Sequence, residues 1–304
     1  GGTLYLNVGG RAGYRNLANS DTDESYIIED QGPSASGVGR RIRVIAFGRS
    51  NVIENVTGLV GNFGSGNDSV VFRGASPISV TLNMGDGEDV VVWDGSGYAN
   101  ISGGNENGSS DSNSQGDYIE IQGSGSAIVN GNNGDDYIVH AVESGLAVGA
   151  VTVNGGNGRD RILGGGGSDV IYAGAGDDEV DGPASRIDGG NDNDLINFYL
   201  EDQSGGATLS GGGGRDVVNI IGTASSDALT VTNSGTGVRV DANGALINAS
   251  TVETLLLDGR GGADTFVIDN LGTVSGLSSF NINFEVMKGT VFLLLCCNLM
   301  HFLT

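Results

Sequence analysis

Three aspartates stand nine residues apart in the middle of the chain, each behind a glycine-rich turn. Asp160, Asp169 and Asp178 are the sixth residues of the consecutive nonapeptides GGNGRDRIL, GGGGSDVIY and AGAGDDEVD, which fill residues 155–181. Carboxylates and main-chain carbonyls are oxygen ligands, and Ca²⁺ takes six to eight of them in a forgiving geometry. Because glycine adopts positive φ without strain, successive carbonyls of such a turn can face one space. The residue types and their spacing therefore predict calcium-binding turns.

These turns need strands to position them, and the flanking residues have the alternating apolar pattern that predicts strands. The eighth residue of each nonapeptide, Ile162, Ile171 or Val180, is aliphatic, and alternating apolar residues (VTVN) precede the first turn. A period of two places one set of side chains inward and the other in water. We therefore predict an all-β fold, a parallel β-roll or β-solenoid of about 18–24 residues per coil with Gly/Asp-rich turns.

Each nonapeptide of the tight segment forms half a coil in this interpretation. Asp160 and Asp178 then stack on one edge, and one calcium site is predicted between them. Asp169 faces the other edge, where a second site is predicted with Asp194 across an insertion at 182–188. The full pattern recurs at 211–219, and looser copies stand at 63–71, 84–92, 131–139, 189–197 and 259–267. The predicted ligands of several Ca²⁺ ions are the glycines and aspartates of these turns: Gly155, Gly156, Gly158, Asp160, Gly164, Gly165, Gly167, Asp169, Gly174, Gly176, Asp178, Asp194, Asp216, Asp136, Asp89, Asp68 and Asp264.

The run 155–181 resembles the nonapeptide repeats of the RTX (repeats-in-toxin) family of secreted bacterial proteins. Its looser flanks are similar to the calcium-binding arrays of large bacterial surface and adhesin-like proteins. The resemblance implies a parallel β-roll, export by a type I system and folding triggered by extracellular calcium. The close match covers about 40 residues and the degenerate pattern about 200. This sequence departs from the pattern at Asp192, where the repeat has glycine, and before Asp117, where SNSQG lacks the paired glycines.

Five segments can be distinguished along the chain. Residues 1–41 are an irregular N-terminal β segment, 42–150 a wide-coil solenoid, and 151–222 the calcium β-roll. Residues 223–284 repeat the block that begins at 42, because 42–72 aligns without a gap onto 238–268 at an offset of 196. Residues 285–304 are a non-repeat apolar tail, either an artefact of truncation or a cap over the last coil.

Composition argues against several classes of function. The net charge is −23, with 26 Asp, 11 Glu and 14 basic residues, so we expect no nucleic-acid partner. The final apolar run is shorter than the ~20 residues that span a bilayer, so we expect no membrane span. The adjacent Cys296 and Cys297 build no disulfide framework, and the sequence begins within a repeat, as a piece of a longer chain would. With His140 and His301 as the only histidines and no catalytic motif, we expect no enzyme activity.

These observations favour a calcium-binding structural repeat segment of a secreted or cell-surface bacterial protein. It would fold on extracellular calcium, serve adhesion, stalk formation or secretion, and bind calcium and a glycan or other cell-surface ligand. Its charge of −23 repels itself until cations neutralise it. Two alternatives stay open. One is a non-catalytic RTX module of a secreted protease, lipase or polysaccharide-modifying enzyme, and the other is a calcium-independent β-solenoid that binds glycan or ice.

Overall fold

The computed structural model describes residues 2–7, 23–105, 115–141, 149–201, 203, 205–269, 271–272, 274, 276–283 and 292–296. The regular structure of these residues is all β-strand, and they contain no helix that could cross a membrane. The chain forms two units, residues 1–160 and residues 161–304.

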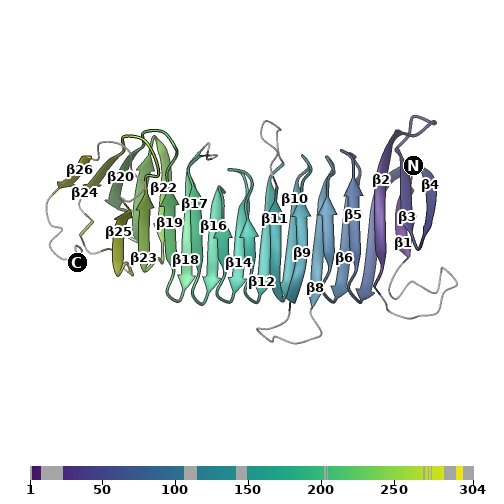
Figure 1. Ribbon diagram of the computed structural model, residues 1–304, viewed down its shortest axis with the longest axis horizontal. Helices are drawn as coiled ribbons and strands as arrows, with labels where there is room; N and C mark the ends of the chain where they lie inside the picture. The colour runs from purple at the N-terminus through teal and green to yellow at the C-terminus, as the bar shows by residue number, and fades with distance from the viewer. Residues whose placement is uncertain are drawn as a thin grey trace. The chain divides into compact units, whose positions relative to one another are not determined.

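Two parallel ladders of strands build the first unit. One ladder runs through β1, β4, β6, β8, β10 and β12, and the other runs through β2, β5, β7, β9 and β11 (Figure 1). From β4 onward, successive strands alternate between the ladders, so each coil contributes one strand to each. The bounds are β1 (Gly2–Asn7), β2 (Ser25–Pro33), β3 (Arg40–Ala46), β4 (Arg49–Ser65), β5 (Ser69–Arg73), β6 (Ser79–Asp86), β7 (Val90–Trp93), β8 (Ala99–Asn105), β9 (Gln115–Ile121), β10 (Ala127–Asn133), β11 (Asp135–His140) and β12 (Val151–Asn157).

The second unit has the same two-ladder construction. One ladder runs through β14, β16, β18 and β22, and the other through β13, β15, β17, β19, β23 and β25. The parallel β-roll or β-solenoid predicted from the sequence is confirmed. The bounds are β13 (Arg161–Leu163), β14 (Val170–Ala175), β15 (Glu179–Asp181), β16 (Arg186–Asn191), β17 (Leu195–Tyr199), β18 (Ala207–Gly213), β19 (Val217–Ile221), β20 (Ala228–Asn233), β21 (Gly237–Ala242), β22 (Ala245–Ser250), β23 (Thr254–Asp258), β24 (Thr265–Asp269), β25 (Ser279–Asn283) and β26 (Phe292–Cys296).

Stacked aliphatic side chains form the core between the ladders. In the first unit Val91 lies in register with Ile119, which lies in register with Ile138, and all three are buried. In the second unit Ile187 and Leu209 form the same kind of pair. Burial of one such side chain contributes about 1.5–3 kcal/mol relative to leaving it exposed. The period-two alternation of the sequence therefore determines which face of each strand is inside.

The coils differ in length more than the sequence pattern indicates. Hydrogen bonds between equivalent aspartates join residues that are 21, 28, 19 and 24 positions apart in the first unit. In the second unit the corresponding separations are 16, 22 and 37. The range is wider than the predicted 18–24 because the coil length varies through the loops, while the strands and the aspartate turns keep their register.

Both units also contain an antiparallel meander, formed by β2, β3 and β4 in the first and by β20, β21 and β22 in the second. Two-residue hairpins with positive φ at both turn residues, Phe47–Gly48 and Asn243–Gly244, connect the last two strands of each. Ala46 pairs with Arg49, and Ala242 pairs with Ala245. The two meanders therefore have the same register at the offset of 196 that the sequence alignment gives.

The C-terminal apolar segment is described only at residues 292–296. These residues form β26, which pairs in parallel with β24, so that Thr265 lies opposite Phe292. Cys297 and His301 lie outside the described residues.

Candidate metal-binding turns

Eight turns that precede buried aspartates share one backbone conformation. Their second and fourth positions, counted within the nonapeptide, have positive φ. The pairs are Gly64/Gly66, Gly85/Gly87, Asn132/Gly134, Gly156/Gly158, Gly174/Gly176, Gly190/Asp192, Gly212/Gly214 and Arg260/Gly262. Asn132, Asp192 and Arg260 replace glycine, and Asn and Asp are residue types that tolerate the left-handed region. The departure from the repeat at Asp192 thus preserves the conformation of the turn.

Close contact between coils also requires glycine at the second position of two turns of the second unit. A Cβ on Gly190 would overlap the carbonyl oxygen of Gly174, and a Cβ on Gly212 would overlap that of Gly190. The two requirements, positive φ and space for the neighbouring carbonyl, act on the same residue.

Gly212→Ala is expected to lower the free energy of unfolding by about 2–4 kcal/mol, because it adds both backbone strain and overlap. The control is Gly213→Ala, one residue further on, where φ is not positive and a Cβ would meet only the Gly190 carbonyl oxygen at 4.0 Å. That change should stay within about 0.5 kcal/mol. Urea unfolding followed by circular dichroism measures both, and equal losses would contradict the stacking of the turns.

A ladder of carboxylates follows the edge on which these turns stack in the first unit. The backbone N–H of each acidic residue donates to the Oδ1 atom of the aspartate one coil further along the chain. The bonds are Glu24 to Asp68 at 2.7 Å, Asp68 to Asp89 at 2.7 Å, Asp89 to Asp117 at 2.8 Å, Asp117 to Asp136 at 2.7 Å and Asp136 to Asp160 at 2.9 Å. We call these residues, with their counterparts in the second unit, the aspartate ladder.

The second unit continues the same chemistry. The N–H of Asp178 donates to Oδ1 of Asp194 at 3.0 Å, and the N–H of Asp194 donates to Oδ1 of Asp216 at 3.0 Å. Glu253 closes this run by accepting from the N–H of Asp216 at 2.8 Å. Each carboxylate thus satisfies a backbone donor at the junction of turn and strand, which would otherwise be buried without a partner.

The second oxygen of several ladder carboxylates is buried without a hydrogen bond within the described residues. This holds for the Oδ2 atoms of Asp68, Asp89, Asp194, Asp216 and Asp264. A buried acceptor of this kind costs free energy unless a proton or a cation satisfies it.

Oxygens from two successive coils meet over the first glycine of the turn. A Cβ on Gly189 would overlap both Oδ2 of Asp194 and the carbonyl oxygen of Gly211 in the next coil. A Cβ on Gly211 would overlap Oδ2 of Asp216 and the carbonyl oxygen of Thr251. Glycine therefore leaves open a space that a carboxylate and a carbonyl share, and both donors are the hard oxygens that Ca²⁺ prefers.

Burial makes these carboxylates weak acids. Removal from water raises the pKa of Asp68, Asp89, Asp160 and Asp194 to about 7, although the N–H donors oppose the shift. Neighbouring carboxylates raise the pKa of Asp194 further, above all that of Asp216, whose own pKa is raised by the same burial. At neutral pH the ladder thus holds charge that burial disfavours and that a cation would stabilise.

The donor set fits calcium if the backbone supplies most of the ligands. Among the described residues, no three Asp, Glu, His or Cys side chains converge on one point. A cation in these turns would therefore combine one or two ladder carboxylates with carbonyls such as that of Gly211. This is the mixed oxygen coordination that Ca²⁺ accepts.

The turn of Asp169 differs from those of the aspartate ladder. Its glycines, Gly164, Gly165 and Gly167, lack positive φ. The Oδ2 atom of Asp169 accepts the N–H groups of Gly165 and Gly166 at 3.1 Å each, so this carboxylate closes its own turn.

The predicted site between Asp169 and Asp194 is wrong. Asp194 lies next to Asp178, because β14 pairs with β16 and β15 with β17. The turn of Asp169 instead contacts the segment after β15, where the N–H of Ser185 donates to the Asp169 carbonyl at 2.9 Å. Residues 182–188 complete a coil and are not an insertion within half a coil. Asp194 therefore lies on the same edge as Asp178.

The other predicted ligands lie where ladder geometry requires them. Asp68, Asp89, Asp136 and Asp160 belong to the ladder of the first unit, with Gly155, Gly156 and Gly158 in the turn before Asp160. Asp178, Asp194 and Asp216 belong to that of the second unit, with Gly174 and Gly176 before Asp178. Asp264 accepts the N–H of Asp227 at 2.9 Å. A joint calcium site of Asp160 and Asp178 stays a prediction.

The glycine pattern misses four acidic residues of the same type. Glu24, Asp117, Asp227 and Glu253 donate or accept the same inter-coil bonds but lack the full turn motif before them. They share a simpler signal, because each stands two residues before a buried apolar residue of a strand: Tyr26, Ile119, Leu229 and Leu255, respectively.

Comparisons with known proteins agree with the geometry of the tightest coils. Residues 152–182 match the family model of the RTX calcium-binding nonapeptide repeat, in four copies. No curated protein and no solved structure matches the chain. Residues 152–182 are therefore similar to RTX calcium-binding nonapeptide repeats.

Proposed function

We propose that the turns along the aspartate ladder bind several Ca²⁺ ions and that this binding stabilises the solenoid. The observation that carries the proposal is the space over Gly189 and Gly211, which the Oδ2 atom of one coil and a carbonyl oxygen of the next share. The RTX repeats at 152–182 support the choice of metal.

The residues of this chain would act through charge and preorganisation. Asp194 and Asp216 would each offer Oδ2 while their Oδ1 atoms stay bound to backbone N–H groups, so that the coil register persists when calcium binds. Bound calcium supplies positive charge to a chain of net charge −23. A ligand that binds only the folded state at 100 times its Kd stabilises that state by about 2.7 kcal/mol per site.

The setting we propose is outside the cell. RTX repeats are typical of secreted bacterial proteins, and extracellular calcium modules bind with Kd values of about 10⁻⁴–10⁻³ M. In the low calcium of the cytosol the segment would be only partly folded, and it would complete its folding after export, as a non-catalytic part of an adhesin, stalk or secreted enzyme. Low cytosolic calcium would then keep the chain competent for secretion.

Calorimetric titration of Ca²⁺ into the full chain tests the assignment. Asp178→Ala should lower the number of bound ions, because Asp178 belongs to the ladder. Asp169→Ala is the matched control and should leave that number unchanged, because its carboxylate closes its own turn. Mg²⁺ should give a far weaker signal, since it demands octahedral geometry. Equal effects of the two variants, or no heat with Ca²⁺, would contradict the proposal.

A calcium-independent solenoid is the second candidate, because each Oδ1 atom already accepts a backbone N–H between coils without a metal. In that case the carboxylates serve as hydrogen-bond acceptors alone. A chelator would then leave the β-sheet signal and the unfolding midpoint unchanged.

A further inference from the structure

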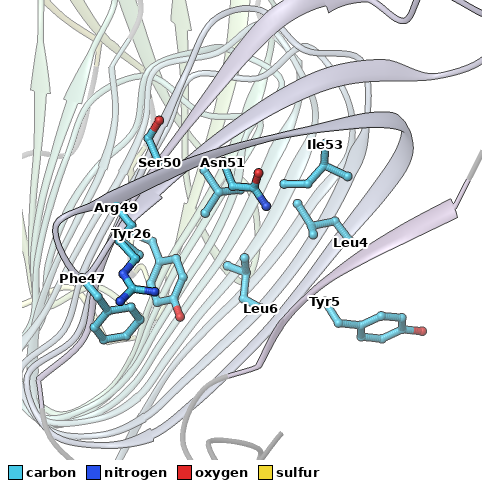
Figure 2. Close-up of a pocket in the computed structure, with 11 residues that line it drawn as sticks. Leu4, Tyr5, Leu6, Tyr26, Phe47, Arg49, Ser50, Asn51 and Ile53 are labelled. Carbon is cyan, nitrogen blue, oxygen red and sulfur yellow. The ribbon is translucent and has the colours of Figure 1, made fainter. Parts of the chain in front are cut away.

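The first unit has an apolar pocket at its antiparallel meander. The pocket has a volume of about 350 Å³, and six of the residues that line it are Leu4, Leu6, Tyr26, Val44, Ala46 and Ile53. Figure 2 shows Leu4 and Leu6 on the pocket side of β1, with Tyr5 directed away from them. We call these six residues the cap face. Phe47 beside them is 53% exposed, which is unusual for a side chain of its size.

The second unit contains the same surface, made by its own meander. Leu4 pairs with Leu59, and Val218 pairs with Leu255. Leu59 and Leu255 are 196 residues apart, so Leu4 corresponds to Val218. By the same register Leu6 corresponds to Ile220. Between the meanders, Val44, Ala46 and Ile53 correspond to Val240, Ala242 and Ala249, and Tyr26 corresponds to Leu229.

The two copies differ in burial. In the second unit the equivalents of the cap face, Val218, Ile220, Leu229, Val240, Ala242 and Ala249, are all buried, with at most 3% exposure. In the first unit Leu4, Val44, Ala46 and Ile53 are partly exposed. In the second unit a neighbouring part of the chain covers this surface. In the first unit no such neighbour lies within the described residues.

One coil provides that neighbour in the second unit. Strand β17 pairs with β19, and β18 pairs with β22 through residues Ala207–Ser210. At the equivalent edges of the first unit, β1 pairs with β4 and the N-terminal part of β4 pairs with β3. No further pairing there falls within the described residues. Two strand edges that have no further strand partner within the described residues, beside an apolar face, form a template for strand addition.

We propose that the cap face binds a partner segment that adds one more parallel coil. The partner contributes two strands whose aliphatic residues alternate, as in β17 (LINFY) and the start of β18 (ATLS). One strand pairs with β1 and the other with residues 51–54, and their inward side chains fill the pocket. This inference does not depend on calcium binding.

A graft tests the fit directly. Residues 195–216 of this chain are placed immediately before Thr3 in the full chain, in place of the first two residues, because Thr3 and Val217 occupy equivalent register positions. Leu195 should then face Thr3, and Ala207 should face Asn51. The control graft carries Ile196→Asp and Leu209→Asp, which places charge on two buried positions.

Hydrogen exchange and a hydrophobic dye give the readouts, in calcium-containing buffer for all chains. The grafted chain should show at least tenfold slower exchange of the outer-edge amides in 3–7 and 51–54, and it should lose dye binding. The control graft should do neither while circular dichroism stays native. Unchanged exchange in the grafted chain would overturn the proposal. So would concentration-dependent self-association of the ungrafted chain that the graft abolishes, because the occupant would then be a second copy of the chain.

Discussion

In the presence of a chelator at pH 7.5, Asp194→Asn is expected to stabilise the chain by about 1–3 kcal/mol. The pKa of Asp194 is raised to about 7 by burial, so the ionised carboxylate opposes folding at this pH. Asparagine removes the charge, and its Oδ1 atom can still accept the N–H of Asp178. Its amide can donate to the Gly211 carbonyl oxygen, which faces the same space.

Calcium should make the native chain more stable than the Asp194→Asn variant, which reverses the order expected in chelator. The asparagine variant loses a charged ligand, so its gain in stability on adding calcium should fall several-fold relative to the native chain. Asp216→Asn should behave in the same way, because Asp216 combines a buried Oδ2 atom with an Oδ1 atom bound to the N–H of Asp194.

Asp194→Ala is the matched control, because it removes the acceptor as well as the charge. It should destabilise the chain by about 1–3 kcal/mol in chelator, since the N–H of Asp178 loses its partner. Urea unfolding followed by circular dichroism compares the three proteins. If the asparagine variant is as unstable in chelator as the alanine variant, the ladder carboxylates do not store the unfavourable charge inferred here.

The stability of the chelated chain is expected to increase as the pH falls from 8 to 5. The folded-state pKa of Asp68, Asp89, Asp160 and Asp194 is about 7, against an ordinary value near 4. Between these values the folded chain binds more protons than the unfolded chain. The free energy of unfolding therefore decreases as the pH rises through this window and becomes level above about pH 8. One pKa unit corresponds to about 1.4 kcal/mol, so the change should reach several kcal/mol.

Two other shifted groups leave this window unaffected. Burial raises the pKa of Asp30, but hydrogen bonds, above all that of Arg40, outweigh burial and lower this pKa overall, so its contribution is lost only in more acidic solution. The pKa of Tyr118 is raised to about 12, far above the window. With saturating calcium the carboxylates stay ionised, so stability near pH 8 should rise and the two curves should converge towards pH 5. Thermal melts at half-unit pH steps provide the measurement, and a chelated chain that loses stability steadily from pH 8 to pH 5 would contradict the prediction.

The sequence predicts the fold through features that are local. Alternation around Val91, Ile119 and Ile138 gives strands with one buried face, and the glycines before each aspartate give the turns. The alignment of 42–72 with 238–268 predicts a duplicated block, and the structure shows that both copies contain part of a meander with the same register. Each of these follows from a few neighbouring residues or from direct self-comparison.

The edge on which each aspartate lies could not be read from spacing. Successive turns lie on opposite edges of the solenoid. The number of half coils between Asp169 and Asp194 therefore decides whether the two residues share an edge. The segment 182–188 can be taken either as an insertion or as a turn between two strands. The pairing of β15 with β17 resolves this in favour of a turn, and strand pairing is a contact between distant residues.

The inter-coil hydrogen bonds could not be predicted for the same reason. Asp89 and Asp117 are 28 residues apart, and the polar sequence before Asp117 obscures the repeat. Glu253 takes an aspartate position only because β23 pairs with β19. Side chains such as these are recognised once the strands are in register.

Circular dichroism of the native chain in chelator and during calcium titration tests the central claim most directly. We expect the β-sheet signal to grow with added calcium, saturating in the range of about 10⁻⁴–10⁻³ M, and the unfolding midpoint to rise with it. Asp160→Ala and Asp178→Ala should each weaken the response. A chain that has its full β-sheet signal in chelator, with a midpoint that calcium does not move, would contradict the account.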